Sequence, residues 1–260
     1  VFVLASTLKI TVDGDRRWRH FAIAGFFSAW AAASELPAAA FAATTMLLLA
    51  RTDLRRTLLV FLPVALIPLA GFLVTNYLVT GGLRPFYAYY GTEKYLYSVD
   101  GVDSYWKNPR GIDKGSDTLP AYLLHCTVGH HGVLSLSPVF LLTVLAWCGI
   151  PRKSTTSLKT LSRVALWMTL IVLGFYLSRT SNYNYGGVSC ALRWMLWLVP
   201  LWLLTMIPVL DVLSGKPRLQ ALAIGLLAVS SISAVIPLEN PFQHPWLFMQ
   251  LESWNWIAYP

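Results

Sequence analysis

The sequence has few charged residues, and this deficit is its most informative property. Only 12% of the 260 residues are Asp, Glu, Lys or Arg, whereas 56% are hydrophobic. A soluble domain carries about 25% charged residues, and the mean hydropathy of +0.56 departs in the same direction. These values exclude an ordinary soluble domain and indicate a protein whose surroundings are lipid.

Several short functional motifs are also missing. The sequence contains no Gly-rich phosphate loop, no nucleophile elbow and no zinc motif. Its three cysteines, Cys126, Cys148 and Cys190, lack the spacing of a metal or redox site. We therefore expect no chemistry driven by a soluble nucleotide, and we assign no metal ligands.

Basic residues are present in excess, giving a formal net charge of +8. They gather in short clusters that flank apolar runs, and they do not line one polar face, so we exclude nucleic acid as a partner. Short basic loops of this kind stay on the cytoplasmic side of a membrane. The clusters comprise Arg16, Arg17 and Arg19; Arg51, Arg55 and Arg56; Arg152, Lys153, Lys159 and Arg163; and Lys216 and Arg218.

The apolar runs between these clusters predict an all-α fold, a polytopic transmembrane helix bundle with about seven membrane segments in one domain spanning residues 1–260. The lipid bilayer is therefore an expected partner. The expected segments are Phe21–Ser34, Ala38–Ala50, Thr57–Val79, Val133–Ile150, Leu161–Leu177, Trp194–Leu210 and Leu219–Ile236. Because the chain opens inside the apolar stretch Val1–Ser6, we expect a fragment whose first helices are missing.

Two further features interrupt this pattern. The first two segments form a short helix pair near the N-terminus that turns at Glu35, with Pro37 in the first turn of the second helix. Thr80–Thr118 is expected to be a long external loop, followed by a short apolar helix, Leu119–Thr127, that lies on or dips into the membrane.

Few residues in these segments can carry chemistry. Glu35 is either a catalytic candidate or an interfacial turn residue, because an ionisable group within an apolar run is costly. Arg193 and Arg179 flank an external turn, where each either clamps a phosphate or snorkels to the interface. His130 and His131 favour helix-entry hydrogen bonds or a phosphate-bearing ligand over a metal.

Acidic residues of the external loop offer a weaker candidate. Asp100, Asp103, Asp113 and Asp117 could bind a divalent cation. The loop also contains many Gly and Lys residues. We therefore interpret these four carboxylates as solvated surface.

Three stretches resemble a known enzyme family. The stretch from Tyr183 through Asn184, Tyr185, Gly186 and Gly187 to Arg193 and Pro200 resembles an external turn of bacterial GT-C superfamily glycosyltransferases, relatives of the protein mannosyltransferases. The segment from His131 to Pro138 and the helix pair around Glu35 resemble two further segments of that family. Cys190 to Leu192 departs from the Phe-Gly-Pro expected before the arginine.

The resemblance implies a multi-pass enzyme of the bacterial inner membrane that moves a sugar from a polyprenyl-phosphate donor to an acceptor on the outer face. Arg193 is then expected to meet the donor phosphate, with the Tyr183–Gly187 turn, Arg179 and His131 beside it. The family's catalytic aspartate has no counterpart here and is expected upstream of Val1. Enzyme activity of this fragment, and its use of a divalent cation, therefore stay open.

Other functions stay open as well. An O-antigen ligase or polymerase also acts on polyprenyl-linked glycans with external arginines and histidines. A transporter would explain the broken helix at Glu35, although the sequence shows no second copy of that break. A non-catalytic membrane subunit would explain the missing aspartate.

Overall fold

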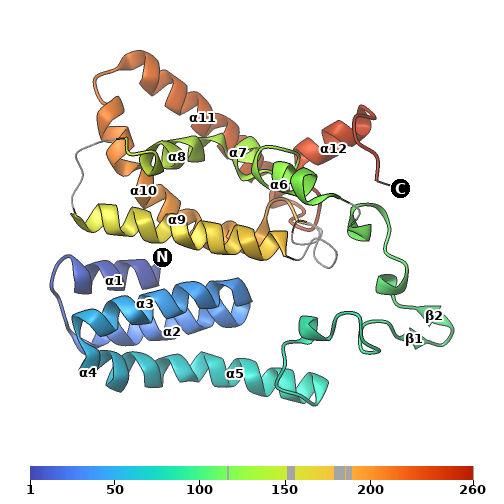
Figure 1. Cartoon of the computed structure of the whole chain (residues 1–260), viewed down its shortest axis with the longest axis horizontal. Coiled ribbons are helices and arrows are strands. Elements are labelled where there is room, and N and C mark those ends of the chain that lie inside the picture. The colour runs from blue at the N-terminus through green and yellow to red at the C-terminus, as the bar shows by residue number, and fades with distance from the viewer. Residues whose placement is uncertain (116, 151–155, 179–184, 186–188, 260) are drawn as a thin grey trace. The chain divides into compact units, whose positions relative to one another are not determined.

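The computed structural model describes residues 1–115, 117–150, 156–178, 185 and 189–259. Its regular structure is almost entirely helical, so the predicted all-α class is confirmed. The chain falls into two compact units, Val1–Pro109 and Arg110–Pro260, which we call unit 1 and unit 2. Figure 1 colours unit 1 from blue to teal and unit 2 from green to red, and each is described by itself.

Unit 1 is built mainly from helices that pack side by side. They are α1 (Phe2–Thr11), α2 (Trp18–Ser34), the 3-10 turn Leu36–Ala38, α3 (Ala39–Thr52), α4 (Leu54–Arg56), a π-helical stretch Thr57–Phe61 and α5 (Leu62–Thr80). Beyond α5 come the 3-10 turns Phe86–Tyr89 and Tyr105–Lys107, with a small antiparallel pair between them, β1 (Ser98–Val99) and β2 (Val102–Asp103).

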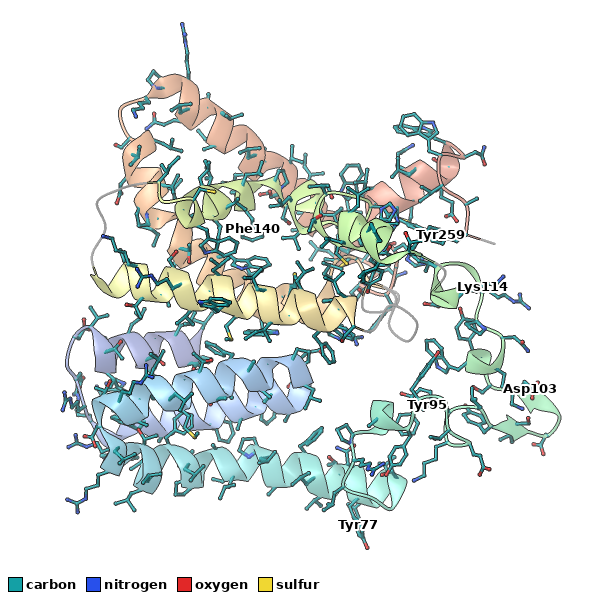
Figure 2. All side chains as sticks on the ribbon, in the orientation of Figure 1. Tyr77, Tyr95, Asp103, Lys114, Phe140 and Tyr259 are labelled. Atoms are coloured by element: carbon teal, nitrogen blue, oxygen red, sulfur yellow. The ribbon has the colours of Figure 1, made fainter. Side chains whose placement is uncertain are left out.

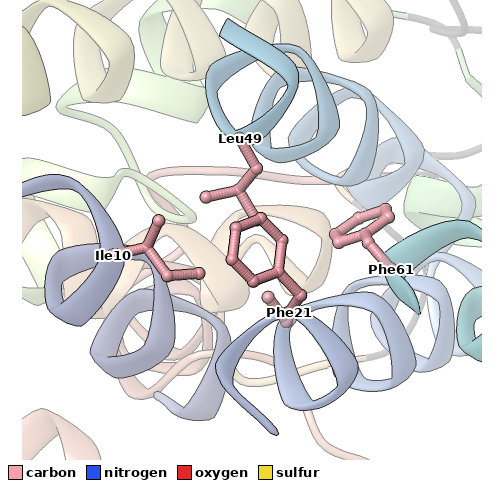
Figure 3. Packing of buried hydrophobic residues seen from close by; sticks show 5 residues of the cluster. Ile10, Phe21, Leu49 and Phe61 are labelled. Carbon is pink, nitrogen blue, oxygen red and sulfur yellow. The ribbon is translucent and has the colours of Figure 1, made fainter. Parts of the chain in front are cut away.

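The core of unit 1 is apolar and lies where α1, α2, α3 and the π-helical stretch meet. Figure 3 shows Ile10, Phe21, Leu49 and Phe61 directed toward one another. Gly25 lets the backbones approach, because a Cβ added there would lie 2.3 Å from the carbonyl oxygen of Phe61. The sequence property that favours this contact is the small-residue surface of α2.

The predicted helix pair is confirmed. Residue Glu35 has an extended backbone (φ −138°, ψ 109°) that ends α2, and Pro37 stands in the first turn after it. The carbonyl of Glu35 accepts a hydrogen bond from the N–H of Ala38 at 2.9 Å, which closes the turn. Proline suits this position because its missing N–H has no helical partner to lose.

Unit 2 contains the remaining helices. They are the 3-10 turn Gly111–Lys114, α6 (Leu119–Thr127), α7 (Val133–Leu136), the 3-10 turn Pro138–Phe140, α8 (Leu141–Trp147), α9 (Thr156–Leu177), the 3-10 stretch Arg193–Leu198, α10 (Val199–Leu213), α11 (Pro217–Val235), the 3-10 turn Ile236–Leu238 and α12 (Trp246–Ser253). The segment from α6 to α8 runs antiparallel to α9 and packs along it.

Four helices among the described residues are long and apolar enough to cross a membrane, which supports a membrane protein but not the predicted seven segments. They are Leu54–Thr80, Leu158–Leu177, Arg193–Leu213 and Pro217–Leu238. The two members of the helix pair contain 17 and 14 residues, fewer than the roughly 20 of a full span.

The predicted span Val133–Ile150 is broken into short pieces. Ser137 leaves the helical region (φ −133°, ψ 68°), so α7 ends before Pro138 and α8 begins only at Leu141. The ring of a proline disfavours helical backbone at the residue before it. Hydropathy alone predicts one continuous helix here, but the Ser137–Pro138 pair divides it into pieces that are each too short to cross a membrane.

Inside each unit, the helix ends next to the basic clusters can be located. In unit 1, the connections between α1 and α2 and between α3 and α4, which carry the two basic clusters, lie at the same end of the helices (Figure 1). In unit 2, Lys159 stands near the start of α9, whereas Trp194 donates its N–H to Tyr176 near the other end. Since α9 has 22 residues, these ends lie about 33 Å apart.

Candidate functional site

Four of the chain's five histidines gather in unit 2. His125 lies on α6, His130 and His131 form the turn after it, and His244 precedes α12. The rings of His125 and His130 stack with centroids 3.9 Å apart, and those of His131 and His244 meet edge to face at 5.8 Å. We call this group the histidine cluster.

A tight turn brings the cluster together. Gly129 stands so close to α6 that an added Cβ would lie 2.4 Å from Nδ1 of His125. The chain therefore reverses directly beneath α6, and the side chains of His130 and His131 become almost fully buried, with 0% and 1% of their surface exposed. A residue with any side chain at position 129 would force this turn open.

Tyr185 is the described member of the predicted external turn, and it is fully buried against the cluster. Its backbone is left-handed (φ +51°), a strained conformation for a bulky residue. Its N–H donates to the hydroxyl of Tyr122 at 3.0 Å, and its ring stacks on His131 with centroids 4.7 Å apart. Such strain persists only where the surroundings hold it.

Asp117 joins the tyrosines to the histidines. Its carboxylate accepts hydrogen bonds from the hydroxyl of Tyr185 at 2.7 Å and from that of Tyr259 at 3.2 Å. The oxygen of Tyr259 lies 2.9 Å from Nε2 of His130, and Nδ1 of His130 contacts Nδ1 of His131. Figure 2 labels Tyr259, which lies near α6.

These contacts fix the ring protons. Because a carboxylate only accepts, Tyr259 donates to Asp117 and its oxygen accepts from Nε2–H of His130. In neutral imidazoles, Nδ1 of His130 then accepts from Nδ1–H of His131. The lone pair on Nε2 of His131 is left buried, with no hydrogen-bond partner among the described residues.

Burial keeps the imidazoles and phenols of the network uncharged. It lowers the pKa of His130 to about 3, with a further lowering from His125 and His244. Burial also lowers the pKa of His131 well below its ordinary value, and the neighbouring histidines add to this effect. The pKa values of Tyr185 and Tyr259 rise, first through burial and then through Asp117. The site therefore presents an uncharged acceptor nitrogen at neutral pH.

A small cavity of about 60 Å³ opens beside His131 and is also lined by Ala191, Leu192 and Met195. It shares Val133, Phe140, Met195 and Trp202 with an apolar groove of about 280 Å³, which runs between α8, α9 and α10. We call this second space the apolar groove. A polar end and a long apolar extension suit an amphipathic molecule better than a water-soluble one.

The sequence-predicted site residues are distributed unevenly. His131 and Tyr185 belong to the cluster, and Arg193 is exposed one residue beyond Leu192 of the cavity wall. Glu35 is half-buried at the turn of the helix pair in unit 1. The other predicted members, Arg179, Tyr183, Asn184, Gly186 and Gly187, lie outside the described residues.

Sequence reasoning missed five residues of the network. Asp117 was interpreted as solvated surface, but it accepts two tyrosine hydroxyls. The others are Tyr122, His125, His244 and Tyr259. The sequence did offer one signal for this cluster. All four of its histidines, His125, His130, His131 and His244, lie outside the four long apolar helices.

A metal site is not formed by these residues. Within the part of the chain that the structure describes, no group of three or more His, Cys, Asp or Glu is arranged to hold an ion. The Nδ1 atoms of His130 and His131 contact each other directly, which leaves no room for an ion between them. What the arrangement offers is proton acceptance and proton transfer along a hydrogen-bonded chain.

No family model, no curated protein and no solved structure matches the chain.

Proposed function

We propose that this chain is a multi-pass glycosyltransferase of the GT-C type in a bacterial inner membrane. It moves a sugar from a polyprenyl-phosphate donor to an acceptor hydroxyl on the outer face. One observation carries the proposal: the buried, neutral His131 has an unpartnered Nε2 and lines a cavity that shares four wall residues with the apolar groove. A lipid-linked sugar needs both features, a base for the acceptor and a channel for the tail.

Each part of the site has a separate role in this proposal. The apolar groove takes the polyprenyl tail. Arg193, exposed at the start of the candidate span Arg193–Leu213, faces the donor phosphate, because a guanidinium pairs well with phosphate oxygens. His131 accepts the hydrogen bond of the acceptor hydroxyl.

In the transfer step, the acceptor oxygen bonds to the anomeric carbon while the bond from that carbon to the phosphate oxygen breaks. The electron pair of the broken bond stays on the phosphate, and the acceptor proton moves to Nε2 of His131. The products are a glycoside, a polyprenyl phosphate and a protonated imidazole, which later returns its proton to water. Arg193 stabilises the charge that develops on the leaving phosphate.

The lowered pKa of His131 fits this sequence of events. In the ligand-free protein, burial keeps the imidazole neutral and weakly basic. The negative charge of a bound phosphate raises the pKa of a nearby imidazole. The base therefore gains strength only when the donor occupies the site, which limits wasteful proton uptake.

A proton-coupled transporter is the second candidate. The hydrogen-bonded chain from Asp117 through Tyr259 and His130 to His131 favours it, because such chains conduct protons in membrane pumps. The two functions differ in what they need. Transfer requires a sugar donor, whereas proton coupling changes pH across a vesicle without one.

The test uses the purified protein in lipid vesicles with a radiolabelled polyprenyl-phosphate hexose. His131→Gln is expected to lower the rate of sugar transfer by about 100-fold to 10,000-fold, the range for removing a general base. His20→Gln is the matched control, since His20 lies in unit 1 and contacts Asp15 at 3.0 Å. Transfer that survives His131→Gln unchanged would remove this residue from the mechanism. Proton flux without donor, abolished by Tyr259→Phe, would favour transport instead.

A further inference from the structure

A second pocket lies at the other end of unit 2, far along α9 from the histidine cluster. Its volume is about 300 Å³, and it opens between the end of α8, the start of α9 and the second half of α10. Lys159, Arg163 and Thr205 line it, together with Trp147. We call it the basic pocket.

Two cations stand on one side of this pocket. Lys159 and Arg163 are four residues apart on α9 and therefore share a helix face, where like charges repel each other. Both are exposed, and neither makes an ion pair with any residue that the structure describes. An anion between them would relieve this repulsion.

A buried hydroxyl faces the same space. Thr205 is 3% exposed and lines the pocket, yet its Oγ1 has no hydrogen-bond partner among the described residues. Threonines inside helices usually donate to the carbonyl four residues earlier, as Thr169 does to Ala165 at 2.7 Å. The hydroxyl of Thr205 does not make this hydrogen bond to the helix backbone, so it is available to an external acceptor.

The basic pocket lies next to the apolar groove. Trp147 and Leu166 line both, and the indole N–H of Trp147 donates to the carbonyl of Ser162 at 3.2 Å, which fixes the ring between them. A ligand in the basic pocket can therefore extend an alkyl chain into an apolar channel. Inorganic phosphate can pair with Lys159 and Arg163, but it has no alkyl chain to place in the apolar groove.

We propose that the basic pocket binds the phosphate headgroup of an anionic phospholipid, whose acyl chain enters the apolar groove. The phosphate oxygens accept from the ammonium of Lys159, the guanidinium of Arg163 and the hydroxyl of Thr205. Basic pockets between membrane helices are a known setting for anionic headgroups. The headgroup site uses none of the histidine cluster, but its acyl chain occupies the apolar groove that the proposed function assigns to the polyprenyl tail, so the phospholipid and the sugar donor compete for this groove.

Short-chain phosphatidylglycerol titrated into the detergent-purified protein tests the site, with short-chain phosphatidylcholine and inorganic phosphate as separate arms. Binding is followed by native mass spectrometry. The double variant Lys159→Gln with Arg163→Gln is expected to weaken phosphatidylglycerol binding by roughly 25-fold, about fivefold for each charge. The matched control, Lys216→Gln with Arg218→Gln at the exposed α10–α11 turn, is expected to change it less than about twofold.

Thr205→Val separates a ligand contact from a structural role. It removes the hydroxyl but keeps the shape, so phosphatidylglycerol affinity is expected to fall by roughly fivefold. The melting temperature without lipid should stay equal or rise, because no hydrogen bond is lost. Equal losses for the two charge-pair variants, or full affinity in Thr205→Val, would overturn the proposal. So would phosphate that binds as tightly as phosphatidylglycerol.

Discussion

The two units of this chain handle polar groups in opposite ways. Unit 1 has an apolar core and carries charge in surface pairs, such as Lys9 with Asp13 at 2.7 Å and Arg56 with Asp53 at 2.7 Å. Unit 2 buries imidazoles and phenols in a connected network around Asp117. A buried network is costly unless nearly every group is satisfied. Three ring nitrogens of the histidine cluster, on His125, His131 and His244, lack a partner among the described residues. Of these three histidines, His131 lines the small cavity, which marks the place where a ligand belongs.

The largest difference between the two units is expected at Tyr185, in the buried network of unit 2. Tyr185→Ala removes a fully buried ring that stacks on His131, so we expect a loss of about 3–5 kcal/mol in the free energy of unfolding. The exposed residue Tyr77 of unit 1 provides the comparison. Tyr77→Ala should change the free energy of unfolding by less than about 0.5 kcal/mol. Denaturation in mixed micelles measures both. Equal effects would show that Tyr185 is not held by the network.

A smaller effect is expected from pH. His130 has a folded pKa of about 3 against an ordinary value of 6.5, so the unfolded chain binds a proton first as pH falls. Stability is then complete above pH 6.5 and falls toward pH 3, by about 1.4 kcal/mol per pH unit for this histidine. Thermal unfolding across this window measures the slope. His130→Gln should make the slope shallower without removing it, because burial also lowers the pKa values of His125, His131 and His244. An unchanged slope would show that His130 does not contribute to it.

The smallest effect belongs to the surface of unit 1. Lys9→Gln removes an exposed ion pair with Asp13, and we expect less than about 1 kcal/mol of lost stability. Added salt should abolish even this difference, because exposed charges are screened. Unfolding measured at low and high salt checks it. A loss of several kcal/mol would mean that unit 1 also depends on its ionic contacts.

The sequence carried enough information for the long helices and the helix pair, because hydropathy and the Glu35–Pro37 break are local signals. It failed at Val133–Ile150, where one proline outweighed a continuous apolar run. The site was only half predictable. His131 and Tyr185 stand in recognisable motifs, but Tyr259 reaches His130 across 129 residues and Asp117 across 142. No local pattern encodes such a pairing, since it arises only when the chain has packed.

The close approach at Gly25 also limits how unit 1 can move. Because a methyl group at this position would collide with the carbonyl of Phe61, only this residue of α2 can face that point. Sliding α2 by one step would bring Ala24 or Phe26 into the contact. Shear between α2 and the π-helical stretch is therefore opposed, and these two segments keep one register along each other.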